Sequence, residues 1–269
     1  MDIVAVGRSC LKVIFIGDIV NLKEFFSTYP KVAVAFSGGV DSAYLLYMAC
    51  RHAEKVKAYY VKSAFQPQFE LDDAERLAKE LHADMTIIRL DVLSDETIRQ
   101  NPPNRCYFCK KKIFSAIREQ AAKDGFQVLL DGTNASDDAG DRPGMVALQE
   151  LAVMSPLRLC GLTKQDIRRL SKEAGLFTWD KPAYACLATR IPSGQAIDER
   201  LLQRTEKAES FLASLGFRDF RVRTLGEQAK LQVQSSQLPL LMNVRKQIID
   251  ELKQDYQAVL LDLEARDEH

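Results

Sequence analysis

Ser37-Gly38-Gly39-Val40-Asp41-Ser42 decides the fold, because it joins the apolar run Val32–Phe36 to the helix-like stretch Ala43–Met48. Its small residues let the backbone approach a ligand closely. The first N–H groups of a helix have no partner within the helix, so they point at such a ligand with a favourable dipole. The stretch therefore predicts a strand, a tight turn and a helix that together hold a nucleotide pyrophosphate.

The composition is that of an ordinary globular chain. Its 269 residues, 46% hydrophobic and 28% charged, are enough for one large domain or two unequal ones. The 37 basic and 37 acidic residues balance, which makes nucleic acid an unexpected partner. No apolar run has the length of a membrane span. Six cysteines in a chain of this length indicate reduced thiols in the cytoplasm rather than a secreted disulfide scaffold.

Strand-like and helix-like segments alternate through the first part of the chain. The strand patterns are apolar on both faces, which is typical of a parallel sheet covered by helices on both sides. We expect an α/β fold of this kind, with a small C-terminal α+β unit. The expected strands are Val32–Phe36, Val56–Val61, Met85–Leu90 and Val128–Leu130, with helices at 42–52, 71–81, 109–123 and 167–174 and a loop or short helix at 91–99.

The pattern changes after Pro192-Ser193-Gly194. A helix is expected over 198–215, then strands over 220–225 and 230–233, a helix over 238–253 and a last strand over 258–263. We therefore divide the chain into an extension of uncertain structure (1–20), a nucleotide-binding domain (21–194) and a smaller α+β domain for substrate binding or oligomerisation (195–269).

Two segments are expected at the same edge of the parallel sheet. Ligands in such sheets bind beyond the carboxyl ends of the strands, where both Ser37–Ser42 and Asp131–Asn134 fall. Asp131 and Gly132 thus join the candidate nucleotide site, and Asp41 is a candidate magnesium ligand. A plain tight turn is the alternative. The stretch is neither a Walker loop, which needs Gly-Lys-Ser/Thr, nor a dinucleotide fingerprint, which needs three spaced glycines.

Ser37–Ser42 resembles the PP-loop of the N-type ATP pyrophosphatases, such as GMP synthetase, NAD synthetase and the tRNA thiolases. The resemblance implies cleavage of ATP between its α and β phosphates, transfer of AMP to the substrate and release of pyrophosphate.

The cysteines form two groups. Cys10, Cys50 and Cys160 sit in apolar surroundings and are expected to be buried. Cys106 and Cys109 make a CxxC in a loop, and Cys186 lies far downstream. A redox pair, half a zinc site or two cluster ligands are the possible meanings of the CxxC. With Cys186, it supplies the three thiolates that suit a four-iron cluster with one open iron.

Several further motifs together resemble the LarE family, the ATP-dependent sulfur transferases of nickel-pincer nucleotide cofactor synthesis. The resemblance covers about residues 21–262. Its motifs are Arg105-Cys106-Tyr107-Phe108-Cys109-Lys110, Asp131-Gly132-Thr133-Asn134-Ala135-Ser136-Asp137, Arg142-Pro143-Gly144, Ser155-Pro156-Leu157, Gly161-Leu162-Thr163-Lys164, Trp179-Asp180-Lys181-Pro182-Ala183, Ala185-Cys186-Leu187 and Arg190-Ile191-Pro192-Ser193-Gly194.

This resemblance implies a reaction. Such enzymes adenylate a carboxylate of pyridinium-3,5-biscarboxylic acid mononucleotide and replace the AMP with sulfur, once for each carboxylate. The family uses two sulfur sources. A single cysteine at the Cys186 position gives up its own sulfur, or three cysteines hold a [4Fe-4S] cluster that relays a sulfide. Because Cys106, Cys109 and Cys186 occur together, the resemblance favours the cluster, with Cys186 as sacrificial donor the alternative.

The resemblance also implies roles for charged residues. Arg221 and Arg223 occupy the positions of the family's phosphate-binding arginines, with Thr189 and Arg190 assisting. In a strand Arg221 and Arg223 share one face; an exposed charged face is the alternative. Lys181 and Arg105 are expected to stabilise charge, and Trp179 to stack on a ring or pack. The family further implies a homohexamer.

Two other functions compete with this one. A tRNA thiolase also combines a PP-loop with CxxC and a third cysteine, although the neutral charge counts against it. An amide-forming ligase of the NAD synthetase kind would need no cluster.

Overall fold

The computed structural model describes residues 21–137, 143–264 and 266, so the extension 1–20 and Cys10 lie outside the described residues. Four strands form a parallel sheet in the order β3-β2-β1-β4. They are β1 (Lys31–Ala35), β2 (Lys55–Lys62), β3 (Met85–Arg89) and β4 (Val128–Leu130). The predicted parallel sheet is confirmed, and each strand matches its expected range to within one residue.

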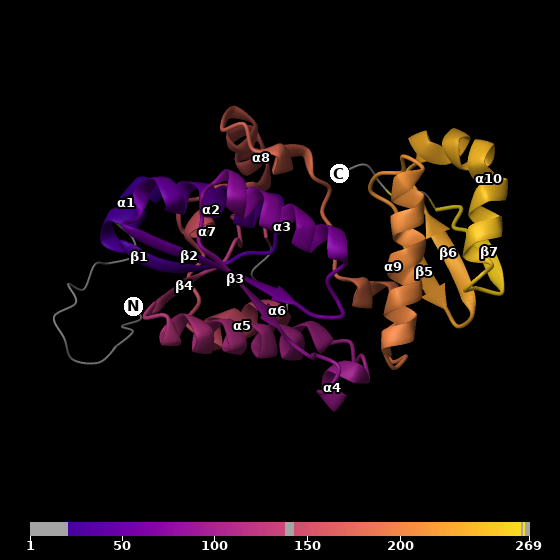
Figure 1. Ribbon diagram of the computed structural model, residues 1–269, viewed down its shortest axis with the longest axis horizontal. Helices are drawn as coiled ribbons and strands as arrows, with labels where there is room; N and C mark the ends of the chain where they lie inside the picture. Colours follow the sequence, from indigo (N-terminus) through magenta and orange to yellow (C-terminus); the bar gives the residue numbers. More distant parts are fainter. Residues whose placement is uncertain (1–20, 138–142, 265, 267–269) are drawn as a thin grey trace.

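Helices cover both faces of this sheet (Figure 1). One layer contains α1 (Leu22–Thr28), α2 (Val40–His52), α3 (Gln68–Glu80), α7 (Pro156–Leu159) and α8 (Lys164–Glu173). The other contains α5 (Arg105–Lys123) and α6 (Pro143–Glu150), with α4 (Glu96–Arg99) at one end. Side chains alternate along the strands: Val32 and Val34 pack under the first layer, and Ala33 packs under the second.

The second sheet belongs to the C-terminal part. Its strands β5 (Arg221–Leu225), β6 (Gln228–Gln232) and β7 (Ala258–Leu261) pair in that order, antiparallel and then parallel. The helices α9 (Glu199–Ser214) and α10 (Leu238–Leu252) share a separate hydrophobic core with it. This agrees with the expected α+β unit, whereas the division of the chain at residue 194 stays a prediction.

A third core cluster lies where the two parts meet. It joins Phe65, which follows β2, to Leu187 in a short 3₁₀ helix, η3 (Leu187–Arg190), and to Leu202 on α9. Phe65 accepts a backbone hydrogen bond from Leu187 (2.9 Å). This cluster fixes the segment around Cys186 at the end of the parallel sheet that faces α9 (Figure 1).

The structure corrects two local predictions. The CxxC was expected in a loop, but α5 begins at Arg105, so Cys106 and Cys109 lie in its first turns. The stretch Trp179–Pro182 was expected as a loop, but Phe177–Asp180 forms a 3₁₀ helix, η2. In the described ranges two more 3₁₀ helices occur, η3 and η4 (Ser235–Gln237).

Among the described residues, no helix combines the length and the apolar character needed to cross a bilayer.

Candidate functional site

The PP-loop turns from β1 into α2 through one backbone conformation that favours glycine. Gly38 has φ +75°, in the left-handed region, and Gly39 is the N-cap of α2. The Ser42 hydroxyl accepts a bond from the Ser37 backbone N–H (3.2 Å) and donates one to the Gly39 carbonyl (3.2 Å). The Ser37 and Ser42 hydroxyls also lie 3.0 Å apart. The loop is therefore closed on itself, with the first N–H groups of α2 at its mouth.

The end of β4 packs directly on this loop, as expected. A Cβ added at Gly132 would lie 2.9 Å from the backbone nitrogen of Ser42, so only glycine fits there. The Asp131 carboxylate is buried and accepts bonds from the hydroxyls of Ser155 (2.6 Å) and Thr133. Both of its oxygens are engaged, which suits it to hold the loop after β4 in place.

Asp41 points its carboxylate at a lysine. Its Oδ2 accepts a bond from Lys164 Nζ (2.6 Å), and Thr163 caps α8 just before Lys164 in a complete capping box with Asp166. Burial raises the pKa of Asp41, against the opposing effect of Lys164. Its buried Oδ1 has no hydrogen-bond partner in the described part of the chain. An unpartnered carboxylate oxygen beside a phosphate-binding loop fits a magnesium ion.

One cavity of about 410 Å³ connects the PP-loop to Cys186. The PP-loop contributes Ser37, Gly39, Val40 and Asp41 to its wall, and Cys186 also lines it. Apolar side chains from β2 and α5 line the floor, and the cations on its wall are Lys110, Lys164 and Lys181. Lys181 also bonds Asp73 (2.7 Å) and the Gly38 carbonyl (3.3 Å), which ties the wall to the loop.

The three cysteines predicted to act together lie close enough to affect one another electrostatically. Cys106 is exposed, and Cys109 and Cys186 are half-buried. Burial, and then the neighbouring Cys186, raises the pKa of Cys109 to about 12. Burial also raises the pKa of Cys186, while Arg105 beside it works in the opposite direction. The Cys109 and Cys186 thiols are therefore neutral until a metal or a base removes their protons.

The guanidinium groups near the cysteines are held by the protein itself. Arg190 is fully buried and forms a two-point ion pair with Glu209 on α9 (2.7 and 3.0 Å). Its remaining donors reach the Ala185 carbonyl and the Thr189 hydroxyl. Arg105 bonds Asn101 (2.7 Å) and the Ala188 carbonyl (3.0 Å). Arg190 and Arg105 thus position the Cys186 segment from two sides.

Arg221 and Arg223 do share one face of β5, with Val222 buried on the other. Arg223 donates to Gln232 (2.6 Å) and to the Thr189 carbonyl (3.2 Å). Burial and then the positive charge of Arg190 lower the pKa of Arg221 to about 10. In the described part of the chain neither arginine forms an ion pair with a carboxylate. Their positive charge is available to an anion.

The other sequence candidates lie away from this chemistry. Trp179 packs under Lys172, whose ammonium is 4.5 Å from the ring centroid, and its carbonyl accepts a bond from Arg168. Cys50 and Cys160 are half-buried against the main core.

Comparison with known proteins places this geometry in a family. A family model described as queuosine biosynthesis protein QueC matches residues 31–101. A pyridinium-3,5-bisthiocarboxylic acid mononucleotide synthase of Lactiplantibacillus plantarum is 35% identical over 210 residues, which cover 77% of this chain and 76% of that protein. This chain belongs to the LarE family.

Two other relatives extend the comparison. An uncharacterized protein of Synechocystis sp. is 33% identical over 253 residues, covering 91% of this chain and 92% of that protein. A tRNA-specific 2-thiouridylase MnmA of Thermotoga sp. is more distant, at 26% identity over 188 residues, which cover 54% of this chain and 52% of that protein. The chain is an ATP-dependent enzyme of the PP-loop class, which uses ATP with magnesium.

Two residues that line the cavity, Lys110 and Glu70, were not predicted from the sequence. Lys110 directly follows the CxxC, and none of the described carboxylates pairs with it. Glu70 lies in the first turn of α3, and burial raises its pKa to about 7. Lys110 carried a weak signal, because it belongs to the quoted CxxC motif. Glu70 carried none, because the pattern of α3 is that of an ordinary amphipathic helix.

Cys106, Cys109 and Cys186 do not form a site for a single metal ion. No three Cys, His, Asp or Glu side chains in the ranges 21–137, 143–264 and 266 lie close enough together to bind one ion. A single ion draws its ligands tightly around it, since Zn–S bonds are about 2.3 Å long. Cys106, Cys109 and Cys186 are near enough to affect one another electrostatically, and thiolates are the usual ligands of an iron–sulfur cluster.

Proposed function

We propose that this chain is an ATP-dependent sulfur transferase that converts both carboxylates of pyridinium-3,5-biscarboxylic acid mononucleotide to thiocarboxylates. The observation that carries the proposal is the single cavity bordered by the PP-loop and by Cys186. A carboxylate bound there lies between the groups that hold ATP and the position from which sulfur comes.

The first half-reaction forms an acyl adenylate. A carboxylate is a poor electrophile, because its leaving group would be oxide; attachment to AMP supplies a good one. The N–H groups at the start of α2 and the ammonium groups of Lys110, Lys164 and Lys181 offset the charge on the departing pyrophosphate. Magnesium, when held at Asp41, would neutralise part of that charge.

The substrate's phosphate is assigned to Arg221 and Arg223. They carry cationic charge without a carboxylate partner in the described chain, and Thr189 joins them to the Cys186 segment. We assign Arg190 a positioning role rather than contact with the phosphate, because four of its five N–H donors already bond to the protein.

In the second half-reaction sulfur attacks the acyl carbon at the Cys186 position. We propose that Cys106, Cys109 and Cys186 hold a [4Fe-4S] cluster, which would supply a sulfide when bound. Arg105 and Arg190 lie beside Cys186 and favour its thiolate form. The alternative is that Cys186 donates its own sulfur.

The proposal is tested by incubating the enzyme with ATP, magnesium and the biscarboxylate under anaerobic conditions. AMP, pyrophosphate and a thiocarboxylate product are expected in step with one another. Iron and sulfide analysis, with intact mass after turnover, separates the two sulfur sources. Iron lost in Cys106→Ala, Cys109→Ala and Cys186→Ala supports the cluster, whereas an iron-free protein that loses the mass of hydrogen sulfide from Cys186 excludes it.

The same experiments discriminate the rival functions. The likeness to tRNA-specific 2-thiouridylases makes a tRNA substrate the second candidate. Salt-sensitive tRNA binding, with no pyrophosphate released on the biscarboxylate, would favour it. Amide formation with ammonia by a triple Cys→Ala variant would indicate a ligase. Light scattering tests the homohexamer that we propose for the assembly.

A further inference from the structure

We propose that Glu70 accepts the proton of the sulfur nucleophile when the acyl adenylate is converted to the thiocarboxylate. The inference rests on the proposed function and assigns a step to a residue that neither the motifs nor the comparisons single out.

The location of Glu70 is set by the contact between α3 and the PP-loop. A Cβ added at Gly38 would lie 3.1 Å from the backbone oxygen of Glu70, so the first turn of α3 touches the loop. The Glu70 side chain lines the same cavity as Ser37, Asp41 and Cys186. It therefore borders the same space as the PP-loop and Cys186.

Glu70 is the cavity carboxylate that the protein leaves unused. Within the described residues Asp41 is the other carboxylate on the cavity wall, and it is bound by Lys164. Glu70 has neither a hydrogen bond nor an ion pair with the rest of the described chain. A carboxylate that is not held by a partner can exchange a proton with a bound ligand.

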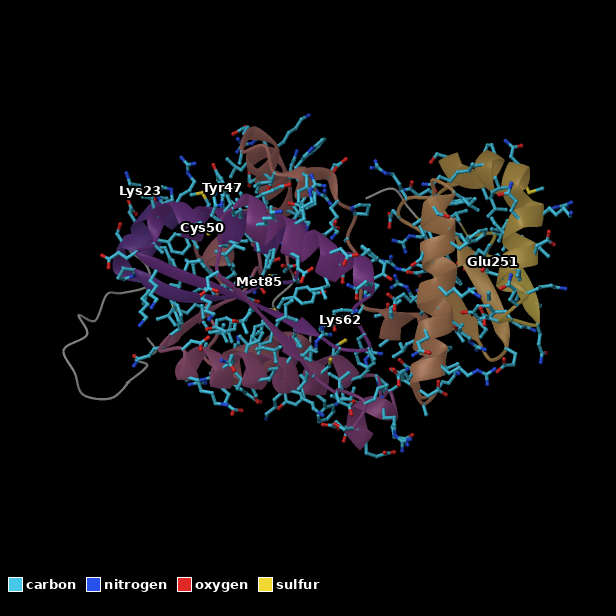
Figure 2. The ribbon with its side chains drawn as sticks, viewed as in Figure 1. Lys23, Tyr47, Cys50, Lys62, Met85 and Glu251 are labelled. Atoms are coloured by element: carbon cyan, nitrogen blue, oxygen red, sulfur yellow. The ribbon has the colours of Figure 1, made fainter. Side chains whose placement is uncertain are left out.

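The charged groups around Glu70 are already committed elsewhere. Lys181 is bound by Asp73 and Gly38, and Arg190 is bound by Glu209. Lys62, which Figure 2 shows at the end of the sheet nearest α9, donates to the Gln66 carbonyl. The groups that act electrostatically on or near Glu70 are Lys62 on β2, Asp72 and Asp73 on α3, Lys181 and Tyr184 on the segment after η2, Arg190 on η3 and Tyr60 on β2.

Their combined effect supports the assignment. Burial comes first among the causes that raise the pKa of Glu70 to about 7, with Asp73 adding to it and Lys181, Arg190 and Lys62 opposing it. A base whose pKa lies near the working pH is well matched to proton transfer.

The step balances as follows. The nucleophile is a hydrosulfide or, in the alternative route, the Cys186 thiol, and it carries one S–H proton that the product of this step lacks. With a hydrosulfide that product is the thiocarboxylate itself. With Cys186 it is a thioester, which releases the thiocarboxylate when the Cβ–S bond of Cys186 breaks and the Cα proton is lost, leaving dehydroalanine. The sulfur forms a bond to the acyl carbon, the bond from that carbon to the AMP oxygen breaks, and AMP leaves with the bonding electron pair. The S–H proton passes to the Glu70 carboxylate and then to solvent. No oxidant or reductant is consumed.

The test compares Glu70→Gln with Glu75→Gln, an exposed glutamate on the same helix. Two rates are measured with ATP and the biscarboxylate: ATP–pyrophosphate exchange and thiocarboxylate formation. In Glu70→Gln we expect exchange within about twofold of the wild type and thiocarboxylate formation slower by roughly 10²-fold or more. Glu75→Gln should match the wild type in both.

The pH dependence of the sulfur-transfer rate would not change if Glu70 had only a structural role. Wild-type sulfur transfer should rise with pH through an apparent pKa near 7, while Glu70→Gln should lack this rise. Glu70→Asp keeps a carboxylate and should recover part of the rate. Because ionising Glu70 in the folded state is unfavourable, Glu70→Gln should also raise the melting temperature at pH 8 more than at pH 5.

The outcomes distinguish a wrong role for Glu70 from a wrong proposed function. If the wild type shows no exchange with the biscarboxylate, the proposed function fails. If exchange is normal and Glu70→Gln transfers sulfur at the wild-type rate, only the role of Glu70 is refuted. Equal loss of exchange and transfer in a folded Glu70→Gln protein would also refute it, because Glu70 would then serve nucleotide binding.

Discussion

The buried ion pair between Arg190 and Glu209 allows a quantitative prediction. The Glu209 carboxylate accepts four hydrogen bonds, from two nitrogens of Arg190, from the Tyr184 hydroxyl (2.6 Å) and from the Val222 backbone (2.9 Å). Its side chain is 5% exposed and that of Arg190 is 0% exposed. Glu209→Ala therefore leaves a guanidinium charge in the interior without its counter-ion.

The magnitude follows from that burial. Removing one partner of a buried pair destabilises by about 3–5 kcal/mol. At roughly 2–4 °C per kcal/mol for a chain of similar size, the melting temperature should fall by roughly 6–20 °C. The exposed pair Arg169–Glu173, with side chains 58% and 59% exposed, provides the control. Glu173→Ala should cost about 0–1 kcal/mol.

Urea unfolding gives the free energy of unfolding of both variants, and thermal melting gives their melting temperatures. A double variant, Arg190→Met with Glu209→Leu, removes both charges and should regain at least half of the lost stability. It should still be deficient in sulfur transfer, because Thr189 and the Cys186 segment lose their anchor. A loss of less than about 1 kcal/mol of unfolding free energy in Glu209→Ala would refute the reasoning, because a buried charge without its counter-ion destabilises the fold by more than that.

Three further perturbations test other parts of the site. Gly132→Ala should reduce ATP–pyrophosphate exchange by at least about tenfold, because the new methyl would meet the Ser42 backbone at 2.9 Å and displace the PP-loop. Normal exchange in Gly132→Ala would contradict the packing. Thr163→Ala should destabilise by about 1 kcal/mol in urea unfolding through loss of the α8 capping box, and a change below a few tenths would contradict it. Arg221→Gln should raise KM for the mononucleotide about tenfold or more with little effect on KM for ATP, and an equal effect on both would remove Arg221 from the phosphate site.

Local patterns were enough to predict the frame of the fold. The strands β1 to β4 are short apolar runs bounded by turns, and the capped helix after Thr163 has its signal in four consecutive residues. The shared face of Arg221 and Arg223 follows from the period of a strand alone.

Features that depend on distant partners could not be predicted in this way. The start of α5 at Arg105 is supported by a bond to Ala188, 83 positions away, so nothing near the two prolines before it indicated a helix. The pairing of Arg190 with Glu209 likewise joins η3 to α9. Glu70 shows the limit most clearly: its chemistry comes from the cavity around it, which only the fold creates.

The segment Lys181–Tyr184 lines two cavities, and this position suggests its part in the proposed reaction. It borders the cavity of the PP-loop and also a second cavity of about 220 Å³. Arg221 lines this second cavity together with aromatic side chains from α3 and from the segment just before β5. A mononucleotide whose phosphate stays at Arg221 can present one carboxylate at a time to the acyl adenylate site.

In the proposed reaction, conversion of the second carboxylate requires the pyridinium ring to turn or to be bound again between rounds. The barrier between the cavities is suited to this movement. Pro182 and Ala183 are exposed and belong to no helix or strand, whereas Lys181 and Tyr184 on either side are anchored to Asp73 and Glu209. A short exposed stretch between two anchored residues is the part of the wall shared by the two cavities that moves most easily.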